Sequence, residues 1–482
     1  MKIRFTLLSL LLLFAFEWTA QSQQMPLLST EALKEDFQVF QNSIQDIHPG
    51  LYWYNDTTTI VQRFRHIEEQ IGSGLELKTW YALLQEFYAK INCGHSWMSV
   101  PYAWRKQLEE GPYQLPFDIY FEKDKATLLN DLTPDQLLTK SHKVKTINGE
   151  PIMEVFNQLL QYAPSDGYNL TRRRQLVAWN FSRYYQTFIR HDSTVSLTLV
   201  SPSGAEKEVQ MKALQKSVAD STRSARESLA ASDDNALAAF KMINAETGYL
   251  RLKTFARGWL KNRKINYDKF LKSTFAQLQQ SEAKVLVLDL RGNGGGSDTF
   301  GAKLCQYLIP NEFNYFDRME TVTSKFKYRK YSSTRWFNWV GVLFRKDKEQ
   351  PGLYTFNYHS PLKTQKPQKT AFTGQLIVLT DGGTFSTAAD VASILHANNR
   401  AVFVGEEVGG GYYGNNSAIQ YQIKLPNSGI TYYIPVVRYY SSVDFPEFYG
   451  HGVKPDIAVS PSYEDFIAGR DTVLEKAIEA IK

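Results

Sequence analysis

Apolar residues repeat at helical spacing through the first part of the chain. From Ser29 onward the repeat is carried by Leu33, Phe37, Phe40, Ile44 and Ile47. It ends at His48-Pro49-Gly50, a sequence that stops a helix. Two further segments, at about residues 57–71 and 77–91, show the same pattern. The spacing therefore predicts a mainly helical domain over residues 23–110.

The pattern changes to short strands and turns over residues 111–214. Residues 143–152 read as a strand, an Asn-Gly turn and the start of a helix. Residues 195–200 and 206–211 lie on either side of Ser201-Pro202-Ser203-Gly204, an arrangement that is typical of a β-hairpin. We therefore predict a second, β-rich domain.

Strands and helices alternate in the last part of the chain, residues 241–482. It follows a polar, charged stretch rich in serine and alanine, residues 215–240, which we interpret as a linker. Continuous apolar runs at 284–290, 375–379 and 401–405 indicate strands that are buried on both faces. Each of the first two runs into a glycine-containing turn and then a helix. This pattern predicts an α/β domain.

Residues 311–373 differ from the rest of this domain and read as an insertion. They mix lysine and arginine with tryptophan, tyrosine and phenylalanine. A basic, aromatic loop can contact a membrane surface or hold a substrate. We interpret it instead as a solvated flap over the functional site, with its aromatic side chains packed against the body of the domain.

Ser386 stands where one buried strand turns into its helix. The turn is Thr380-Asp381-Gly382-Gly383-Thr384, and Phe385-Ser386-Thr387 begins the helix. A hydroxyl at this place lies beside unpaired backbone N–H groups and the positive end of the helix dipole, which suits a nucleophile. Capping the helix is the commoner role of a serine there. Local sequence leaves both roles open.

A glycine-rich turn follows the other buried strand, at Arg291-Gly292-Asn293-Gly294-Gly295-Gly296. Consecutive glycines let backbone N–H groups point at an anion. A dinucleotide-binding turn is one alternative, but the spacing of these glycines does not match Gly-x-Gly-x-x-Gly. A purely structural turn is another. We favour half of an oxyanion hole, because the turn that carries Ser386 lies downstream in the same domain.

A third candidate lies far upstream, where Gly94-His95-Ser96 precedes a β-like run. Histidine is the usual general base in enzymes because its pKa is close to neutrality. A lone histidine is nevertheless more often a surface residue or a satisfied polar residue. The residues alone therefore leave the role of His95 open.

Composition excludes several classes of function. The net charge of +6 over 482 residues is too diffuse to indicate a nucleic-acid-binding protein. The sequence contains no Cys/His cluster with zinc spacing, no P-loop and no calcium loop, so we expect neither a metal nor an organic cofactor. Only Cys93 and Cys305 occur, which rules out a disulfide scaffold and leaves their pairing open.

The first 22 residues resemble a cleaved secretory signal. Met1-Lys2-Ile3-Arg4 is basic, residues 7–16 are apolar, and Ala20-Gln21-Ser22 offers small residues at the spacing of a cleavage site. The apolar run is shorter than the roughly 20 residues of a membrane-spanning helix. We therefore expect an exported protein, periplasmic or extracellular, without a transmembrane segment after cleavage.

Four motifs together resemble the carboxyl-terminal-processing, or tail-specific, serine proteases. They are Asp-Leu-Arg-Gly-Asn-Gly-Gly-Gly at 289–296, Thr-Phe-Ser-Thr-Ala-Ala-Asp at 384–390, Val-Gly-Glu-Glu at 404–407 and Gly-Val-Lys-Pro-Asp-Ile at 452–457. The resemblance implies a catalytic domain of the ClpP/crotonase kind with Ser386 as nucleophile. It also implies an oxyanion hole formed by the backbone N–H groups of Gly295 and Thr387.

The resemblance extends to the middle of the chain and to the choice of base. The Ile-Asn-Gly-Glu-Pro segment at 147–151 resembles part of a PDZ module. No lysine lies between Ser386 and Lys424, so the Ser-Lys dyad of the bacterial branch is absent. In the tricorn-like branch a histidine is the base and a glutamate orients it, which implies His95 and Glu447.

The spacing around Glu447 departs from the usual Glu-x-x-Gly-Val, and Asp444 is a rival for the orienting carboxylate. We therefore predict an exported serine endopeptidase that acts on proteins or peptides through Ser386, His95 and Glu447. The alternative is a non-catalytic ligand- or peptide-binding protein on the same fold.

Overall fold

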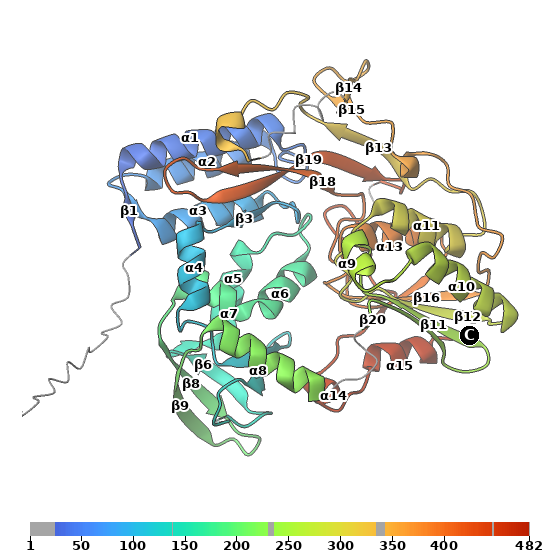
Figure 1. The fold of residues 1–482 in the computed structure, drawn as a ribbon, viewed down its shortest axis with the longest axis horizontal. Coiled ribbons are helices and arrows are strands. Elements are labelled where there is room, and N and C mark those ends of the chain that lie inside the picture. Colours follow the sequence, from blue (N-terminus) through green and yellow to red (C-terminus); the bar gives the residue numbers. More distant parts are fainter. Residues whose placement is uncertain (1–24, 137, 230–235, 334–342, 446–447, 482) are drawn as a thin grey trace, which may run out of the picture.

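The computed structural model describes residues 25–481 apart from 137, 230–235, 334–342 and 446–447. The predicted signal sequence, residues 1–22, and Glu447 therefore lie outside the described residues. The chain is mixed α/β, as predicted, with helices at its start, a β-rich middle and an α/β unit (Figure 1). Within the described residues no helix is long and apolar enough to cross a membrane.

The first region is helical as the periodicity predicts. Ser29 caps the first helix by accepting a hydrogen bond from the N–H of Ala32. On α1, Phe40 packs edge-on against Tyr432 from near the end of the chain, at 5.2 Å between ring centroids. The helical region thus shares a core with the α/β unit. Its elements are α1 (Thr30–Ile47), α2 (Thr57–Gln70), α3 (Leu77–Lys90), β3 (Trp97–Ser99) and α4 (Tyr102–Glu110).

The middle region folds around an antiparallel sheet with its own hydrophobic core. The predicted hairpin is confirmed, since β8 (Thr194–Val200) pairs with β9 (Glu206–Lys212) along its full length. Helix α6 (Leu170–Trp179) follows a short loop, and its first turn contacts the α/β unit, where Thr171 Oγ1 donates to the carbonyl of Glu407 at 3.0 Å. The other elements are β4 (Phe117–Phe121), β5 (Ala126–Asp131), β6 (Lys143–Ile147), β7 (Glu150–Pro151), α5 (Ile152–Leu159) and α7 (Phe181–Tyr184).

The stretch that reads as a linker is not extended chain, because helix α8 (Lys216–Leu229) occupies most of it. Arg223 on this helix forms an ion pair of 2.8 Å with Asp118 of β4. The sequence suggested a linker because the segment is polar and charged. Part of that charge is instead used to hold the helix against the middle region.

The α/β unit is built on a six-stranded sheet in the order β10-β11-β12-β16-β17-β20. All pairs except β10–β11 are parallel. The strands are β10 (Ala238–Met242), β11 (Thr247–Leu252), β12 (Val285–Asp289), β16 (Gln375–Thr380), β17 (Val402–Gly405) and β20 (Ile457–Ala458). Both faces of this sheet are covered, as the continuous apolar runs predict.

Alternate residues of each strand pack against different helices. Leu286 and Leu288 contribute to the core with α10 (Tyr267–Gln280), α11 (Asp298–Leu308) and α13 (Thr387–Ala397). Val285 and Val287 contribute to the core with α15 (Thr472–Glu479). Because β12 and β16 are parallel neighbours, with Asp289 opposite Leu379, their following loops meet at one edge of the sheet. Those loops are the glycine-rich turn and the turn that carries Ser386.

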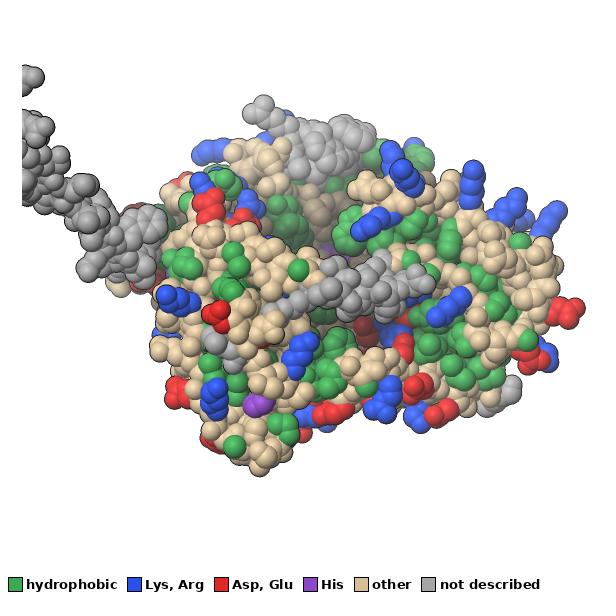
Figure 2. Space-filling model, turned by 60° about the horizontal axis from the view of Figure 1, so that its bottom comes forward, with side chains coloured by type: hydrophobic (Ala, Val, Ile, Leu, Met, Phe, Trp, Pro, Cys, Tyr) green, Lys and Arg blue, Asp and Glu red, His purple; other side chains and the backbone are tan. Residues whose placement is uncertain are grey.

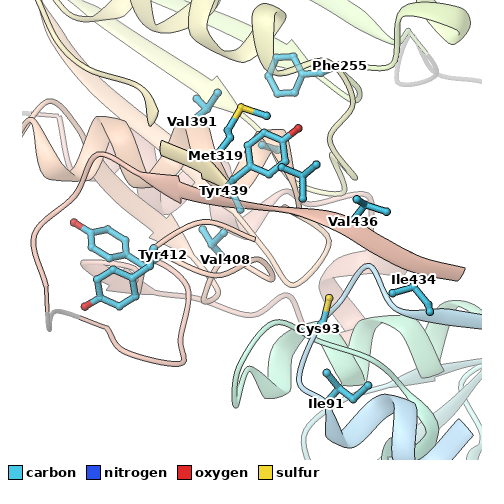
Figure 3. Packing of buried hydrophobic residues seen from close by; sticks show 14 of the residues in the cluster. Ile91, Cys93, Phe255, Met319, Val391, Val408, Tyr412, Ile434, Val436 and Tyr439 are labelled. Atoms are coloured by element: carbon cyan, nitrogen blue, oxygen red, sulfur yellow. The ribbon is translucent and has the colours of Figure 1, made fainter. Parts of the chain in front are cut away.

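A second sheet joins the start of the chain to its end. Its central strand β19 (Thr431–Ser441) pairs with β18 (Asn416–Lys424), with β13 (Phe316–Thr321) and, at Thr431–Tyr433, with β3. Figure 1 shows β18 and β19 running from the N-terminal helices to the α/β unit. In Figure 3, Ile91 and Cys93 lie near the strand that carries Ile434 and Val436.

The remaining strands of this sheet lie in the segment that reads as an insertion. They are β14 (Arg345–Lys346) and β15 (Tyr354–Thr355). The start of the segment, strand β13, is paired with β19 and carries the buried side chains of Phe316 and Met319. The first part of residues 311–373 therefore belongs to the body of the protein rather than to a solvated flap.

Candidate active site

Ser386 and His95 meet although 291 positions separate them in the chain. His95 Nε2 lies 3.0 Å from Ser386 Oγ. Ser386 has φ 56° and ψ −131°, a conformation that a non-glycine residue adopts only under constraint. It directly precedes α13, yet its side chain makes no capping hydrogen bond. The capping role is therefore excluded in this structure, and the hydroxyl faces the imidazole instead.

Burial sets the protonation of His95. Its ring stacks on Phe385 at 4.6 Å between centroids. Burial, with a smaller contribution from nearby Arg172, lowers the pKa of His95 to about 3. The imidazole is therefore neutral near pH 7, which is the state that can accept a proton from the serine.

The second ring nitrogen of His95 has no partner in the described part of the chain. Nδ1 is buried and makes no hydrogen bond there. Asp444, the rival for the orienting carboxylate, is exposed and does not contact this nitrogen. Glu447 lies outside the described residues.

The loop that carries His95 is held by a connecting segment, residues 164–173, from the middle region. Asp166 accepts hydrogen bonds from the N–H of Gly94 at 2.7 Å and of Gly411 at 3.4 Å. The N–H of Gly167 donates to the carbonyl of Asn92 at 2.9 Å. Burial raises the pKa of Asp166 to about 6. The connecting segment thus bridges the His95 loop and the α/β unit.

The glycine-rich turn lies directly against Ser386. Gly295 has φ 91°, and a Cβ atom built on it would lie 2.6 Å from Ser386 Cβ and 2.9 Å from the N atom of Thr387. Only glycine permits this approach. The N–H of Gly295 donates to Asn293 Oδ1 at 2.9 Å, so in this structure the predicted oxyanion donor is already engaged. Thr387 is the first residue of α13, where helix geometry leaves an N–H without an intrahelical acceptor.

A cavity of about 610 Å³ opens beside these residues. Its wall includes His95, Ser386 and two glycines of the glycine-rich turn, Gly294 and Gly296. It also includes three charged side chains, those of Arg172, Arg257 and Asp298. His359 also lines it, with Nε2 3.0 Å from Asp298 Oδ2. The volume is sufficient for side chains of an extended peptide.

No metal site is evident among the described residues, where no group of three His, Cys, Asp or Glu side chains could hold an ion. Cys93 and Cys305 are both buried and free. Lysine, arginine and acidic side chains are interspersed on the face shown in Figure 2 rather than gathered into one basic surface.

Residues 246–459 match the profile of peptidase family S41. This part of the chain, which contains Ser386, is a serine peptidase domain of family S41. The predicted resemblance to tail-specific serine proteases is thereby confirmed, whereas the branch with a histidine base stays a prediction. No curated protein matches the chain.

Solved structures with the same fold include two of mature CPAF. The complex of mature CPAF with lactacystin is 13% identical at a TM-score of 0.64, over 93% of this chain and 98% of that one. Mature CPAF alone is 14% identical at 0.62, over 90% and 94%. The photosystem II D1 C-terminal processing protease is 15% identical at 0.40, over 89% and 94%. The two CPAF matches span both the helical start and the S41 domain, so they extend the shared fold to nearly the whole chain.

The structure brings together Ser386, His95, Gly295 and Thr387, which the sequence singled out. It adds Asp166 and Arg172, which sequence analysis missed, and His48, whose Nε2 lies 2.8 Å from the hydroxyl oxygen of Ser96 next to His95. Asp166 stands in Pro164-Ser165-Asp166-Gly167, a sequence that reads only as a turn. His48 lies at the end of a helix and reads only as a stop signal. Nothing local in the sequence distinguishes these residues, because their roles depend on contacts with distant parts of the chain.

Proposed function

We propose that this S41 peptidase is an exported endopeptidase in which Ser386 is the nucleophile and His95 its general base. The observation that carries the proposal is the 3.0 Å separation of His95 Nε2 and Ser386 Oγ. Nε2 accepts the hydroxyl proton as Oγ attacks the peptide carbonyl, and then gives it to the leaving amine. Export is inferred from the basic and apolar residues at the start of the chain.

The developing oxyanion needs hydrogen-bond donors beside Ser386. The N–H of Thr387 supports this role because it stands at the first position of α13, next to the nucleophile. Gly295 is the second proposed donor. Its N–H would be shared between Asn293 and the oxyanion, since Asn293 Oδ1 already accepts from it.

Proton transfer creates an imidazolium in a buried site, where charge is costly without a partner. The unpartnered Nδ1 of His95 is where a carboxylate would stabilise that charge and fix the tautomer. We assign this role to Glu447, because Asp444 is exposed and makes no contact with Nδ1. Glu447→Gln should lower kcat by about a hundredfold or more, with Asp444→Asn as the matched control that retains kcat.

Labelling with a fluorophosphonate probe tests the nucleophile. We expect labelling and peptide hydrolysis in the wild-type protein, no labelling in Ser386→Ala, and strongly reduced labelling in His95→Ala. Circular dichroism and thermal unfolding would establish that both variants fold. Full hydrolysis by folded Ser386→Ala would refute the assignment.

A further inference from the structure

Arg172 brings a guanidinium into the active-site cavity. It stands in the first turn of α6, and its Cζ lies 4.1 Å from the ring centroid of Phe385. The same phenyl ring stacks on His95 at 4.6 Å. The ring of Phe385 therefore contacts both Arg172 and His95, the proposed general base. Both of these residues line the cavity that contains Ser386.

The guanidinium of Arg172 has no anionic partner in the described part of the chain. Nε is buried without a hydrogen bond, and the side chain forms no ion pair there. The next two residues of α6 differ in this respect. Arg173 donates to Ser165 Oγ and Asn92 Oδ1, and Arg174 donates to the carbonyl of Glu122. An unpaired and largely desolvated cation is costly, which indicates that a ligand completes its contacts.

The acidic residues nearest to Arg172 are occupied elsewhere. Asp166 accepts from the N–H groups of Gly94 and Gly411. Asp381 accepts from the N–H groups of Gly292, Gly383 and Thr384 through Oδ1. Both carboxylates lower the cost of the nearby cation electrostatically, but neither forms an ion pair with it.

The rest of the cavity adds further positive charge. Asp298 uses Oδ2 toward His359 at 3.0 Å and Oδ1 as acceptor from Thr387 Oγ1 at 3.3 Å. Arg257 is exposed and hydrogen-bonded to the hydroxyl of Ser297 at 3.0 Å. The lining therefore contains two guanidinium groups and one carboxylate, and that carboxylate is already engaged in the wall.

We infer that Arg172 is a substrate-binding residue that pairs with a carboxylate of the peptide, so that this peptidase prefers an acidic side chain close to the scissile bond. Guanidinium and carboxylate groups form charge-assisted, often bidentate hydrogen bonds. An extended peptide advances about 3.4 Å per residue. A side chain about two or three residues from the scissile bond can therefore reach Arg172, which is separated from His95 by the ring of Phe385. This inference rests on the proposed function.

Matched peptides test the inference. Internally quenched peptides with amidated ends would carry Glu or Gln at each of the positions flanking the cleaved bond. In the wild-type protein we expect kcat/KM for the best Glu peptide to exceed that of its Gln counterpart by about tenfold or more. In Arg172→Gln the ratio of kcat/KM for the Glu peptide to that for the Gln peptide should fall to about one, whatever the change in the rate common to both peptides.

Arg174→Gln is the matched control, because it removes the same group from the same helix outside the cavity. It should retain the wild-type preference. A preference that survives Arg172→Gln, or a ratio of one at every position in the wild-type protein, would overturn the inference. A second pair of peptides, without acidic side chains and with free or amidated ends, identifies the source of the carboxylate. If Arg172→Gln changes the ratio of kcat/KM values only for this second pair of peptides, Arg172 binds the carboxylate at the end of the peptide chain. The inferred preference for acidic side chains is then wrong.

A binding measurement separates this inference from the proposed mechanism. Folded Ser386→Ala should bind the Glu peptide about tenfold more tightly than the Gln peptide, and the double variant with Arg172→Gln should bind both equally. Equal binding to Ser386→Ala would refute the role of Arg172 even if Ser386 is the nucleophile. The expected binding preference would support Arg172 even if the assignment of the base failed.

Discussion

His48 Nε2 lies 2.8 Å from the hydroxyl oxygen of Ser96, the residue that directly follows His95. The N–H of Gly50 donates to His48 Nδ1 at 3.1 Å, so Nδ1 is the acceptor and the ring proton is on Nε2. His48 therefore donates to Ser96. Both side chains are buried, with His48 only 2% exposed. A residue that ends the first helix thus fixes the loop that presents the proposed general base.

Replacing His48 by Ala should weaken both the fold and the active site. It removes the donor to Ser96 and leaves a cavity, so we expect a loss of roughly 2–3 kcal/mol in the free energy of unfolding. We also expect kcat to fall by about tenfold or more with little change in KM, because a displaced imidazole affects the chemical step. Urea denaturation and steady-state kinetics would measure both quantities. His66→Ala, an exposed histidine on α2, is the control that should change neither.

The pKa values of the two buried histidines predict how a fall in pH affects catalysis and how it affects the free energy of unfolding. Burial lowers the pKa of both His48 and His95 from 6.5 to about 3. In Glu447→Gln, which removes the proposed carboxylate partner of Nδ1, the general base should stay neutral well below pH 6.5, and the acidic limb of kcat/KM should lie closer to pH 3 than to pH 6.5 for as long as the protein remains folded.

Between about pH 3 and 6.5 the unfolded chain binds more protons at these two histidines than the folded chain does, so they lower the free energy of unfolding as the pH falls through this window. Asp166 acts in the other direction, because its pKa is raised from 3.8 to about 6. Denaturation of wild type, His48→Gln and Asp166→Asn at several pH values would separate the contributions. A steeper acid-side slope in His48→Gln would contradict this account.

The contact between Gly295 and Ser386 predicts a sharp difference between neighbouring glycines. Gly295→Ala places a Cβ 2.6 Å from Ser386 Cβ at a residue with φ 91°, so the nucleophile or the turn must shift. We expect kcat to fall by about a hundredfold or more. A Cβ on Gly294 would meet no atom within 4 Å, so Gly294→Ala should keep most of the activity. If both variants lose the same amount of kcat, the turn is sensitive to substitution for some reason other than the contact between Gly295 and Ser386.

Much of the catalytic half could be predicted from the sequence because its signals are local. The apolar runs of β12 and β16 identify buried parallel strands, and parallel neighbours bring their following turns to one edge. That argument alone places the glycine-rich turn beside Ser386. The capping role of Ser386 could not be excluded from sequence, since only its φ of 56° and its orientation toward His95 decide against it.

The position of His95 beside Ser386 could not be derived from local sequence patterns. It depends on three residues of β3 pairing with Thr431–Tyr433 of β19, more than 300 positions away in the chain. Only the resemblance to a protease family indicated it. Asp166 and Arg172 are harder still, because both lie in the middle region and acquire their roles through contacts with distant parts of the chain. Asp166 contacts Gly94 and Gly411, and Arg172 contacts Phe385.

An ion-pair network at the start of the glycine-rich turn, around the buried carboxylate of Asp289, gives the last prediction. Asp289, 1% exposed at the end of β12, accepts hydrogen bonds from Arg291 Nε at 2.9 Å and from the hydroxyl of Tyr249 at 2.7 Å. Arg291 also donates to both oxygens of Asp471 at 2.7 Å. Arg291→Met leaves the Asp289 carboxylate buried with too few donors, so we expect a loss of about 3–5 kcal/mol in the free energy of unfolding, measured by urea denaturation.

The matched control is Lys284→Met, which breaks the ion pair of Lys284 with Glu246, both of them exposed, and should leave the stability unchanged. The double variant Asp289→Leu with Arg291→Met tests the cause. It removes the stranded carboxylate together with its partner, so it should be more stable than Arg291→Met alone. If the double variant is the less stable of the two, the destabilisation comes from lost packing of the arginine side chain rather than from an uncompensated buried charge.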